Sequence, residues 1–112
     1  MLPRGQRLTD AAGFATAVRR GRRAGGPLLV DHLARVDGAH ERRIGFVVAR
    51  SVGPAVTRNR VKRRLRHLVR ERIDALPESA LLVVRAQPAA SSASYGELGA
   101  ALDRCLHRVL EA

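Results

Sequence analysis

Aromatic side chains are scarce in this sequence, which has two phenylalanines, one tyrosine and no tryptophan. Domains that bind single-stranded nucleic acid by stacking several bases on a sheet require more aromatic side chains than this. Phe14, Phe46 and Tyr95 are each expected to belong to the core rather than to a stacking platform. Phe14 alone remains a candidate base contact, because basic residues flank its segment.

Cysteine occurs once, as Cys105, so no disulfide can form within the chain and a reducing compartment is expected. Since Cys105 falls on an apolar stripe, it is predicted to be a small buried hydrophobe. Residues 1–7 lack an apolar signal core, and no apolar run approaches the length of a membrane span. A cytoplasmic protein without a membrane partner is therefore expected.

Motifs of catalysis are also missing. There is no glycine-rich phosphate loop with its lysine, and no Gly-x-Ser-x-Gly element. The four histidines, His32, His40, His67 and His107, are dispersed without metal-ligand spacing, and the acidic residues form no cluster that would hold metal for a nuclease. His67 is expected to be a solvated residue on a helix face. From the residues alone, we predict a binding protein without its own catalytic residues.

Positive charge is what the sequence has in excess. It carries 21 basic residues against ten acidic ones, for a net charge of +11, and Lys62 is its only lysine. Arginine suits bidentate phosphate contacts and stacking on bases, although a GC-rich genome explains the ratio of arginine to lysine better. The net charge itself indicates a nucleic-acid binder or a membrane-surface protein.

Much of this charge lies in residues 57–73, which are predicted to form an amphipathic α-helix. Its apolar residues recur at the spacing of one helix face: Val61, Leu65, Leu68, Val69 and Ile73. Thr57 or Asn59 is expected to cap its start. The other face is basic: Arg58, Arg60, Lys62, Arg63, Arg64, Arg66, Arg70 and Arg72. Because such cations repel one another in the isolated helix and a polyanion would relieve the repulsion, nucleic acid is the first partner to consider.

The remaining segments predict a single domain over residues 1–112, of which 1–8 are basic and expected to be flexible. A short helix is expected at 9–20, strands at 28–36, 43–50 and 81–84, and another helix after the capping box at 94–97. Residues 22–27, 51–56 and 87–92 are interpreted as loops. This order, with two or three strands before the basic helix, indicates an α/β sandwich with helices on one face of a mixed sheet.

Residues 43–66 carry a recognisable motif, RIGFVVARSVGPAVTRNRVKRRLR. Its core is Arg58-Asn59-Arg60-Val61-Lys62-Arg63, downstream of two glycines. The motif resembles the signature of the bacterial ribonuclease P protein subunit. The flanks resemble the same family: Arg7-Leu8 with Phe14, Val18 and Gly21 matches its first helix, and residues 81–85 match its last strand.

The resemblance implies a fold and a function. The fold is an α/β (α+β) two-layer sandwich with a four-stranded mixed sheet, the order α-β-β-β-α-β-α and a left-handed βαβ crossover, although right-handed crossovers are the rule. The function is that of the RNA-binding subunit of ribonuclease P, an endoribonuclease that removes the 5′ leader from precursor tRNA. In that ribonucleoprotein the RNA subunit performs the hydrolysis with Mg²⁺, which the RNA subunit and substrate mainly bind.

The resemblance also implies partners and binding residues. The partners are the ribonuclease P RNA and the leader of precursor tRNA, with no DNA expected. The RNA subunit would contact Arg58, Asn59, Arg60, Lys62, Arg63 and Arg66. The leader-binding cleft, between the first helix and the sheet, would involve Phe14, Val18, His32, Val47, Ala49, Arg50 and Arg85.

The cleft departs from the family pattern at three places. The family often has two lysines where this chain has Arg50-Ser51, so one cation is missing. Aromatic residues are common where Val18 and His32 stand. We therefore expect weaker stacking on the leader and a binding mode that relies more on phosphate contacts.

The residues alone leave other classes open. A DNA-binding module could place the basic helix in the major groove, although a strand and a glycine loop, not a second helix, precede it. A basic ribosomal or assembly protein would have a similar composition. A membrane-surface helix is less consistent, because the apolar face lacks tryptophan and phenylalanine. A soluble domain with a merely solvated basic face is disfavoured by the motif.

Overall fold

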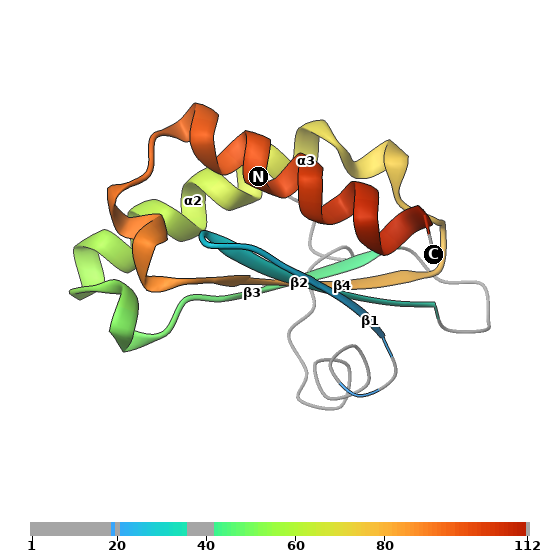
Figure 1. Cartoon of the computed structure of the whole chain (residues 1–112), viewed down its shortest axis with the longest axis horizontal. Coiled ribbons are helices and arrows are strands. Elements are labelled where there is room, and N and C mark those ends of the chain that lie inside the picture. Colours follow the sequence, from blue (N-terminus) through green and yellow to red (C-terminus); the bar gives the residue numbers. More distant parts are fainter. Residues whose placement is uncertain (1–18, 20, 36–41, 112) are drawn as a thin grey trace.

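The computed structural model of the chain describes residue 19 and residues 21–35 and 42–111. Among these residues, a four-stranded sheet forms one layer, and the long helices α2 and α3 lie together over one of its faces (Figure 1). The elements are β1 (Arg22–Gly25), β2 (Leu29–Arg35), β3 (Arg43–Val47), α2 (Ala55–Glu71), β4 (Ala80–Ala86) and α3 (Tyr95–Glu111). Short 3-10 segments connect them at η2 (Arg50–Val52), η3 (Ile73–Ala75) and η4 (Pro88–Ser92). The predicted sandwich is confirmed, and the helix expected at 9–20 lies, except for Arg19, outside the described residues.

The strands lie side by side in the order β1-β2-β4-β3. Strand β2 pairs antiparallel with β1 and with β4, whereas β3 pairs parallel with β4. Parallel neighbours cannot be joined by a tight hairpin, and α2 lies in the crossover between them. The mixed sheet implied by the resemblance is confirmed, and the left-handed sense of the crossover stays a prediction.

Helix α2 begins earlier than predicted. Its N-cap is Pro54, which is extended (φ −61°, ψ 166°) and whose carbonyl accepts a hydrogen bond from the Arg58 N–H at 2.9 Å. Proline is tolerated here because it lacks a backbone donor that would need a partner. The predicted caps Thr57 and Asn59 therefore lie inside the helix, and that prediction is wrong. At the other end, Ile73 lies in η3 and still packs against the core, partly buried.

Helix α3 begins with the predicted capping box. The Ser94 hydroxyl accepts from the Glu97 N–H at 3.1 Å, and the Glu97 carboxylate accepts from the Ser94 N–H at 2.8 Å. Hydrogen bonding of the Glu97 carboxylate to the backbone N–H of Ser94, and to its side chain, lowers the pKa of Glu97. The predicted apolar stripe is confirmed, with Leu110 partly buried and the rest fully buried: Leu98, Ala101, Leu102, Cys105, Leu106 and Val109.

Both faces of the sheet carry buried residues. Alternate strand residues such as Leu29, Ile44 and Leu82 point toward the helices and pack with the apolar stripes of α2 and α3. On the opposite face Ala34, Leu81 and Val83 form a second buried cluster, against which Val47 packs. Because β4 is covered on both faces, its sequence is a continuous apolar run, as predicted for 81–84.

The loop predicted at 22–27 is wrong, because Arg22–Gly25 form strand β1. Arg22 pairs with Leu33, and Arg23 pairs with His32. The chain then turns, and the Gly26 N–H donates to the Leu29 carbonyl at 2.9 Å. Only Ala24 of this edge strand is fully buried, so its sequence shows no apolar alternation. The neighbouring strand, not local propensity, fixes β1 as a strand.

Candidate nucleic-acid interface

Helix α2 presents a row of cations away from the sheet. Its inner face is fixed by the four buried residues Val61, Leu65, Leu68 and Val69. Because a helix turns once every 3.6 residues, the opposite and flanking positions point away from this stripe. They are Asn59, Lys62, Arg63, Arg66 and Arg70. Within the described residues, none of these five side chains forms a hydrogen bond or an ion pair.

Three other arginines of α2 are held by backbone carbonyls. Arg58 Nε donates to the Gly53 carbonyl at 3.1 Å, at the start of the helix. Arg60 Nη2 donates to Ser91 at 3.1 Å, and Arg64 Nη1 donates to Ala93 at 3.2 Å. The last two bonds tie α2 to the segment between β4 and α3. The predicted RNA-contacting set is therefore mixed: Arg58 and Arg60 also anchor the helix, whereas Lys62, Arg63 and Arg66 are available to a partner.

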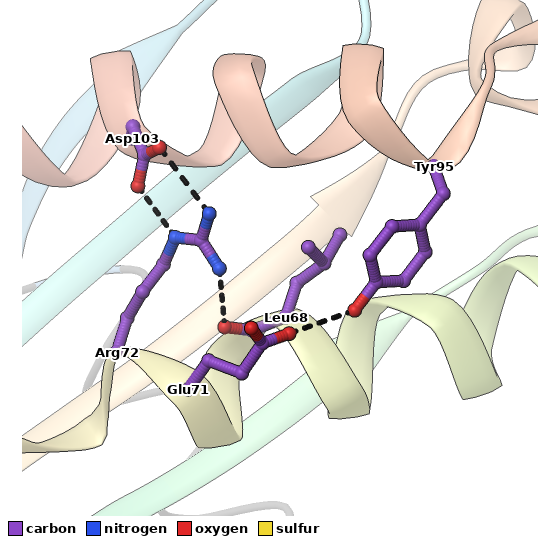
Figure 2. A network of polar contacts seen from close by, with 5 residues as sticks. All are labelled: Leu68, Glu71, Arg72, Tyr95 and Asp103. Atoms are coloured by element: carbon purple, nitrogen blue, oxygen red, sulfur yellow. Dashed lines mark hydrogen bonds and ion pairs between the residues drawn. The ribbon is translucent and has the colours of Figure 1, made fainter.

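The C-terminal end of α2 is locked to α3 by a polar network (Figure 2). Arg72 Nε and Nη2 both donate to the Asp103 carboxylate. Arg72 Nη1 donates to the Leu68 carbonyl at 2.9 Å. The Tyr95 hydroxyl donates to Glu71 at 2.8 Å. Hydrogen bonding to Arg72 lowers the pKa of Asp103. Two acids near the basic helix are thus engaged: Glu71 of α2 with Tyr95 of α3, and Asp103 of α3 with Arg72 of α2.

Tyr95 corrects one prediction and Phe46 confirms another. Phe46 packs against the main core, as expected. Tyr95 is 41% exposed, because it lies at the first turn of α3 and reaches across to Glu71 rather than into the core. His67 is exposed and Cys105 is buried, both as predicted.

The sheet face opposite the helices brings together three of the residues predicted for the leader cleft. Val47 of β3 pairs with Arg85 of β4, and His32 of β2 pairs with Val83, the residue two positions before Arg85. Strand alternation places all of these side chains on the same face. Arg85 is exposed, Val47 is half-buried and His32 is only 7% exposed.

His32 has an unusual surrounding for a histidine. Burial lowers its pKa, and the positive charges of Arg85 and Arg23 lower it further, so the ring is neutral at neutral pH. Its Nδ1 atom is buried without a hydrogen-bond partner among the described residues. Arg23 was not predicted for this site. It stands opposite His32 in the register of β1 and β2, and recognising β1 as a strand would have revealed it.

The other predicted cleft residues divide into two groups. Ala49 and Arg50 are exposed and follow β3, where Ala49 precedes η2 and the Arg50 carbonyl accepts from the Gly53 N–H at 3.1 Å. They lie in the segment that leads from the sheet to α2. Phe14 and Val18 lie outside the described residues. The structure thus assembles His32, Val47 and Arg85, and it adds Arg23.

These features define a class of protein. A small α/β sandwich carries, along one helix, cations that are unpaired within the described residues. On the other side of its sheet, a neutral histidine lies between two arginines. Both surfaces suit a polyanion, because phosphates would satisfy cations that pair with no acid among the described residues. Within the described residues, no three His, Cys, Asp or Glu side chains are grouped so as to hold a metal ion, and no helix is long and apolar enough to span a bilayer.

The particular family follows from comparison with known proteins. The profile of the family described as "Ribonuclease P" matches residues 2–110. The chain belongs to the ribonuclease P protein family. The function of this family is the removal of the 5′ leader from precursor tRNA together with an RNA subunit, which performs the catalysis. The resemblance seen in the motif at 43–66 is confirmed, and so is the function it implied.

Curated relatives and solved structures agree with this assignment. The ribonuclease P protein component of Nocardioides sp. (strain ATCC BAA-499 / JS614) is 56% identical over 111 residues, which are 97% of this chain and 95% of the relative. That of Acidothermus cellulolyticus is 46% identical, over 99% and 93% of the two chains. The Staphylococcus aureus RNase P protein superposes with a TM-score of 0.82 at 20% identity, covering 92% of this chain and 94% of that one. The Thermotoga maritima protein gives 0.78 at 23%, covering 92% and 96%. These two structures share the fold.

Proposed function

We propose that α2 is the surface through which this protein binds the RNA subunit of ribonuclease P. The observation that supports the proposal is that the cations of α2 fall into two groups, one unpaired among the described residues and one bonded within the protein. Lys62, Arg63 and Arg66 have no partner within the described residues, while Arg60 and Arg64 hold the helix in place through Ser91 and Ala93. Free cations on an anchored helix meet phosphates without first breaking a bond inside the protein.

We further propose that the opposite face of the sheet binds the 5′ leader of precursor tRNA. Arg23 and Arg85 supply charge for the leader phosphates, and the neutral, largely buried His32 lies between them. Val47 gives an apolar contact beside Arg85, and Ala49 and Arg50 extend the surface toward α2. Phe14 and Val18 stay in the proposal as the base-contacting residues. Arg23 replaces part of the charge that the missing family lysine would bring.

The proposed role of Mg²⁺ lies with the RNA. The charged groups assigned to both surfaces are cations, which are unsuited to hold Mg²⁺, an ion that prefers oxygen ligands. We therefore assign the ion mainly to the RNA subunit and the substrate. The protein would act by reducing phosphate repulsion where the two RNAs meet and by preferring substrate that still has its leader. A cytoplasmic location follows from these partners.

The first experiment is cleavage of precursor tRNA by a bacterial ribonuclease P RNA at low Mg²⁺, with and without the full chain. Stimulation by the protein, with no cleavage by the protein alone, is expected. Absence of stimulation with a cognate RNA subunit would overturn the proposal. Excess duplex DNA should not compete, and competition by DNA at equal phosphate concentration would favour the DNA-binding alternative.

A second experiment tests α2 directly. The double variant Arg63→Ala/Arg66→Ala should bind the RNA subunit more weakly and lower the slope of log K against log salt by about two, one for each lost phosphate contact. The matched control is Arg22→Ala/Arg35→Ala, which removes the same charge from exposed strand residues. Equal losses of slope in both variants would mean that net charge, and not this helix, determines binding.

A third experiment tests the leader surface. Arg85→Ala and Phe14→Ala should each reduce the preference of the holoenzyme for leader-bearing over mature tRNA, with little change in affinity for the RNA subunit. Arg35→Ala serves as the control. If a variant loses as much affinity for the RNA subunit as preference for the leader, its residue belongs to the RNA-subunit interface. If Phe14→Ala unfolds the protein, Phe14 belongs to the core.

A further inference from the structure

A shallow cavity of about 350 Å³ lies on a part of the molecule that neither proposed surface includes. It is formed between the turn from β1 to β2 and the C-terminal half of α3. Its apolar lining comes from Pro27, Leu29 and Ala101, and its basic lining from Arg104, His107 and Arg108. A volume of this size lies within the range of pockets that hold small ligands.

The basic side chains of this pocket differ in availability. Arg108 Nη1 donates to the Gly25 carbonyl at 2.9 Å, which fixes its guanidinium against the β1–β2 turn. Arg104 is exposed and forms no hydrogen bond or ion pair within the described residues. His107 is paired with Glu111 at 3.0 Å, so its charge is offset when it is protonated. Recognition of an anion therefore depends on Arg104 and the remaining donors of Arg108.

The thiol in the pocket wall is structural. Cys105 is only 2% exposed, and its Sγ lies 3.8 Å from the Leu29 carbonyl, to which it donates. Burial raises the pKa of the thiol, with a further contribution from Asp31, so a nucleophilic thiolate is disfavoured. The pocket is thus a binding site with an apolar floor and a cationic rim, and redox or covalent chemistry is not its use.

We infer that this pocket holds one unpaired nucleotide of the bound RNA. The base would lie against the exposed Pro27, above the buried Leu29 and Ala101, and its phosphate would accept hydrogen bonds from Arg104 and Arg108. An apolar floor beside two guanidinium groups matches the two halves of a nucleotide, a flat base and an anionic phosphate. This inference goes beyond the two proposed surfaces and rests on the proposed function only in that the partner is RNA.

The test is a titration of the full chain, observed through the backbone amide signals of Gly25 and Gly26 by NMR. The probes are adenosine 5′-monophosphate, adenosine, inorganic phosphate and a short oligoglutamate peptide. The mononucleotide should move both signals saturably and bind more tightly than adenosine or phosphate alone. Arg104→Ala should weaken this binding about five- to tenfold, the usual effect of one charge-assisted contact. Arg35→Ala, which removes an exposed arginine at the far end of β2, should leave it unchanged.

Several outcomes would overturn the inference. They are an equal response in Arg104→Ala and wild type, a response to oligoglutamate but not to the nucleotide, and movement of α2 signals alone. In the holoenzyme, Arg104→Ala should lower the salt slope of RNA binding by about one, in addition to the effect of Arg63→Ala/Arg66→Ala. If the α2 variant leaves RNA binding unchanged while the nucleotide still binds at Gly25, the proposed function of α2 fails and the pocket stands.

Discussion

At the scale of single residues, Asp31 is the most unusual group in the described part of the chain. It is fully buried on the helix-facing side of β2, and neither of its carboxylate oxygens has a hydrogen-bond partner there. Burial raises its pKa from 3.8 to about 8. The folded protein therefore keeps Asp31 protonated at neutral pH, since a buried unpaired charge would cost far more than a buried neutral acid.

This pKa predicts how stability changes with pH. Between about pH 4 and pH 8 the unfolded chain releases the Asp31 proton and the folded chain keeps it, so the contribution of Asp31 to stability falls as the pH rises. Urea unfolding from pH 5 to pH 8 should show wild type losing stability relative to Asp31→Asn, and the difference should level off above about pH 8. The control is Asp74→Asn, at a residue whose side chain is 99% exposed. Parallel curves for wild type and Asp31→Asn would contradict a raised pKa.

Gly53 is the residue that permits the turn into α2. Its φ of 149° is rarely adopted by residues with a side chain, and an added Cβ would lie 3.2 Å from Thr57 Cγ2. Gly53→Ala should lower the free energy of unfolding by about 1 to 3 kcal/mol, the usual cost of such backbone strain. Chemical denaturation would measure the loss. Gly26→Ala, where an added Cβ meets nothing closer than 3.9 Å, is the comparison, and equal effects would remove the special role of Gly53.

At the scale of elements, adjacent arginines of α2 have different tasks. Arg64 donates to the Ala93 carbonyl, whereas Arg63 is exposed and has no partner within the described residues. Arg64→Ala should lower the free energy of unfolding by about 1 kcal/mol, the typical net value of a hydrogen bond. Arg63→Ala should leave stability unchanged and weaken RNA binding. Chemical denaturation and an RNA-binding titration of each variant measure the two effects. A loss of stability in Arg63→Ala, with weaker RNA binding in Arg64→Ala, would contradict the assignment.

The sequence predicted elements well where one face of a segment is buried. The inner stripe of α2, the capping box of α3 and the run of β4 each have a local pattern that burial requires. Prediction failed at β1 and at the start of α2. Strand β1 depends on its pairing with Leu33 and His32, and α2 begins at a proline that no capping preference selects. Pairing with another strand determines β1, and backbone geometry at Pro54 determines the start of α2.

The close packing of α2 against α3 could not be predicted from the sequence either. Gly99 faces Leu68 and Arg72, and a Cβ at that place would approach Leu68 Cδ2 to 3.2 Å. Which glycine serves such an approach depends on how the two helices cross, and the sequence of either helix alone does not contain that information. The motif assigned RNA contacts to this helix, which stays a prediction, and it did not indicate that Arg60 and Arg64 would bond to Ser91 and Ala93.

At the scale of the whole molecule, the composition determines the net charge of +11, but it does not predict how the basic residues are distributed over the surface. The sheet order places Arg23, His32 and Arg85 on one face although they are far apart in the chain. Few acids offset these charges in the described residues, and Arg72 holds one of them, Asp103. The isolated protein therefore contains considerable self-repulsion, which a bound polyanion would relieve.

This repulsion predicts that salt stabilises the free protein. Raising the concentration of KCl from about 0.05 M to about 0.5 M shortens the screening length severalfold and should raise the melting temperature. Arg63→Glu/Arg66→Glu, which lowers the net charge, should show a smaller rise. Thermal unfolding followed by circular dichroism measures both. A melting temperature that falls with salt in the wild type would mean that attractive ion pairs outweigh the repulsion.

The position of β4 between β2 and β3 has a consequence for how the protein is made. The ribosome delivers β2 and β3 well before Ala80–Ala86 emerges, so each lacks the neighbour that it has in the finished sheet. Contacts between distant segments form slowly, because the intervening loop must close first. During this interval α2 has already been synthesised, with its arginines not yet tied to Ser91 or Ala93. The nascent chain thus exposes its most basic segment to cellular RNA before its scaffold exists, and an early encounter with RNA could guide folding as well as follow it.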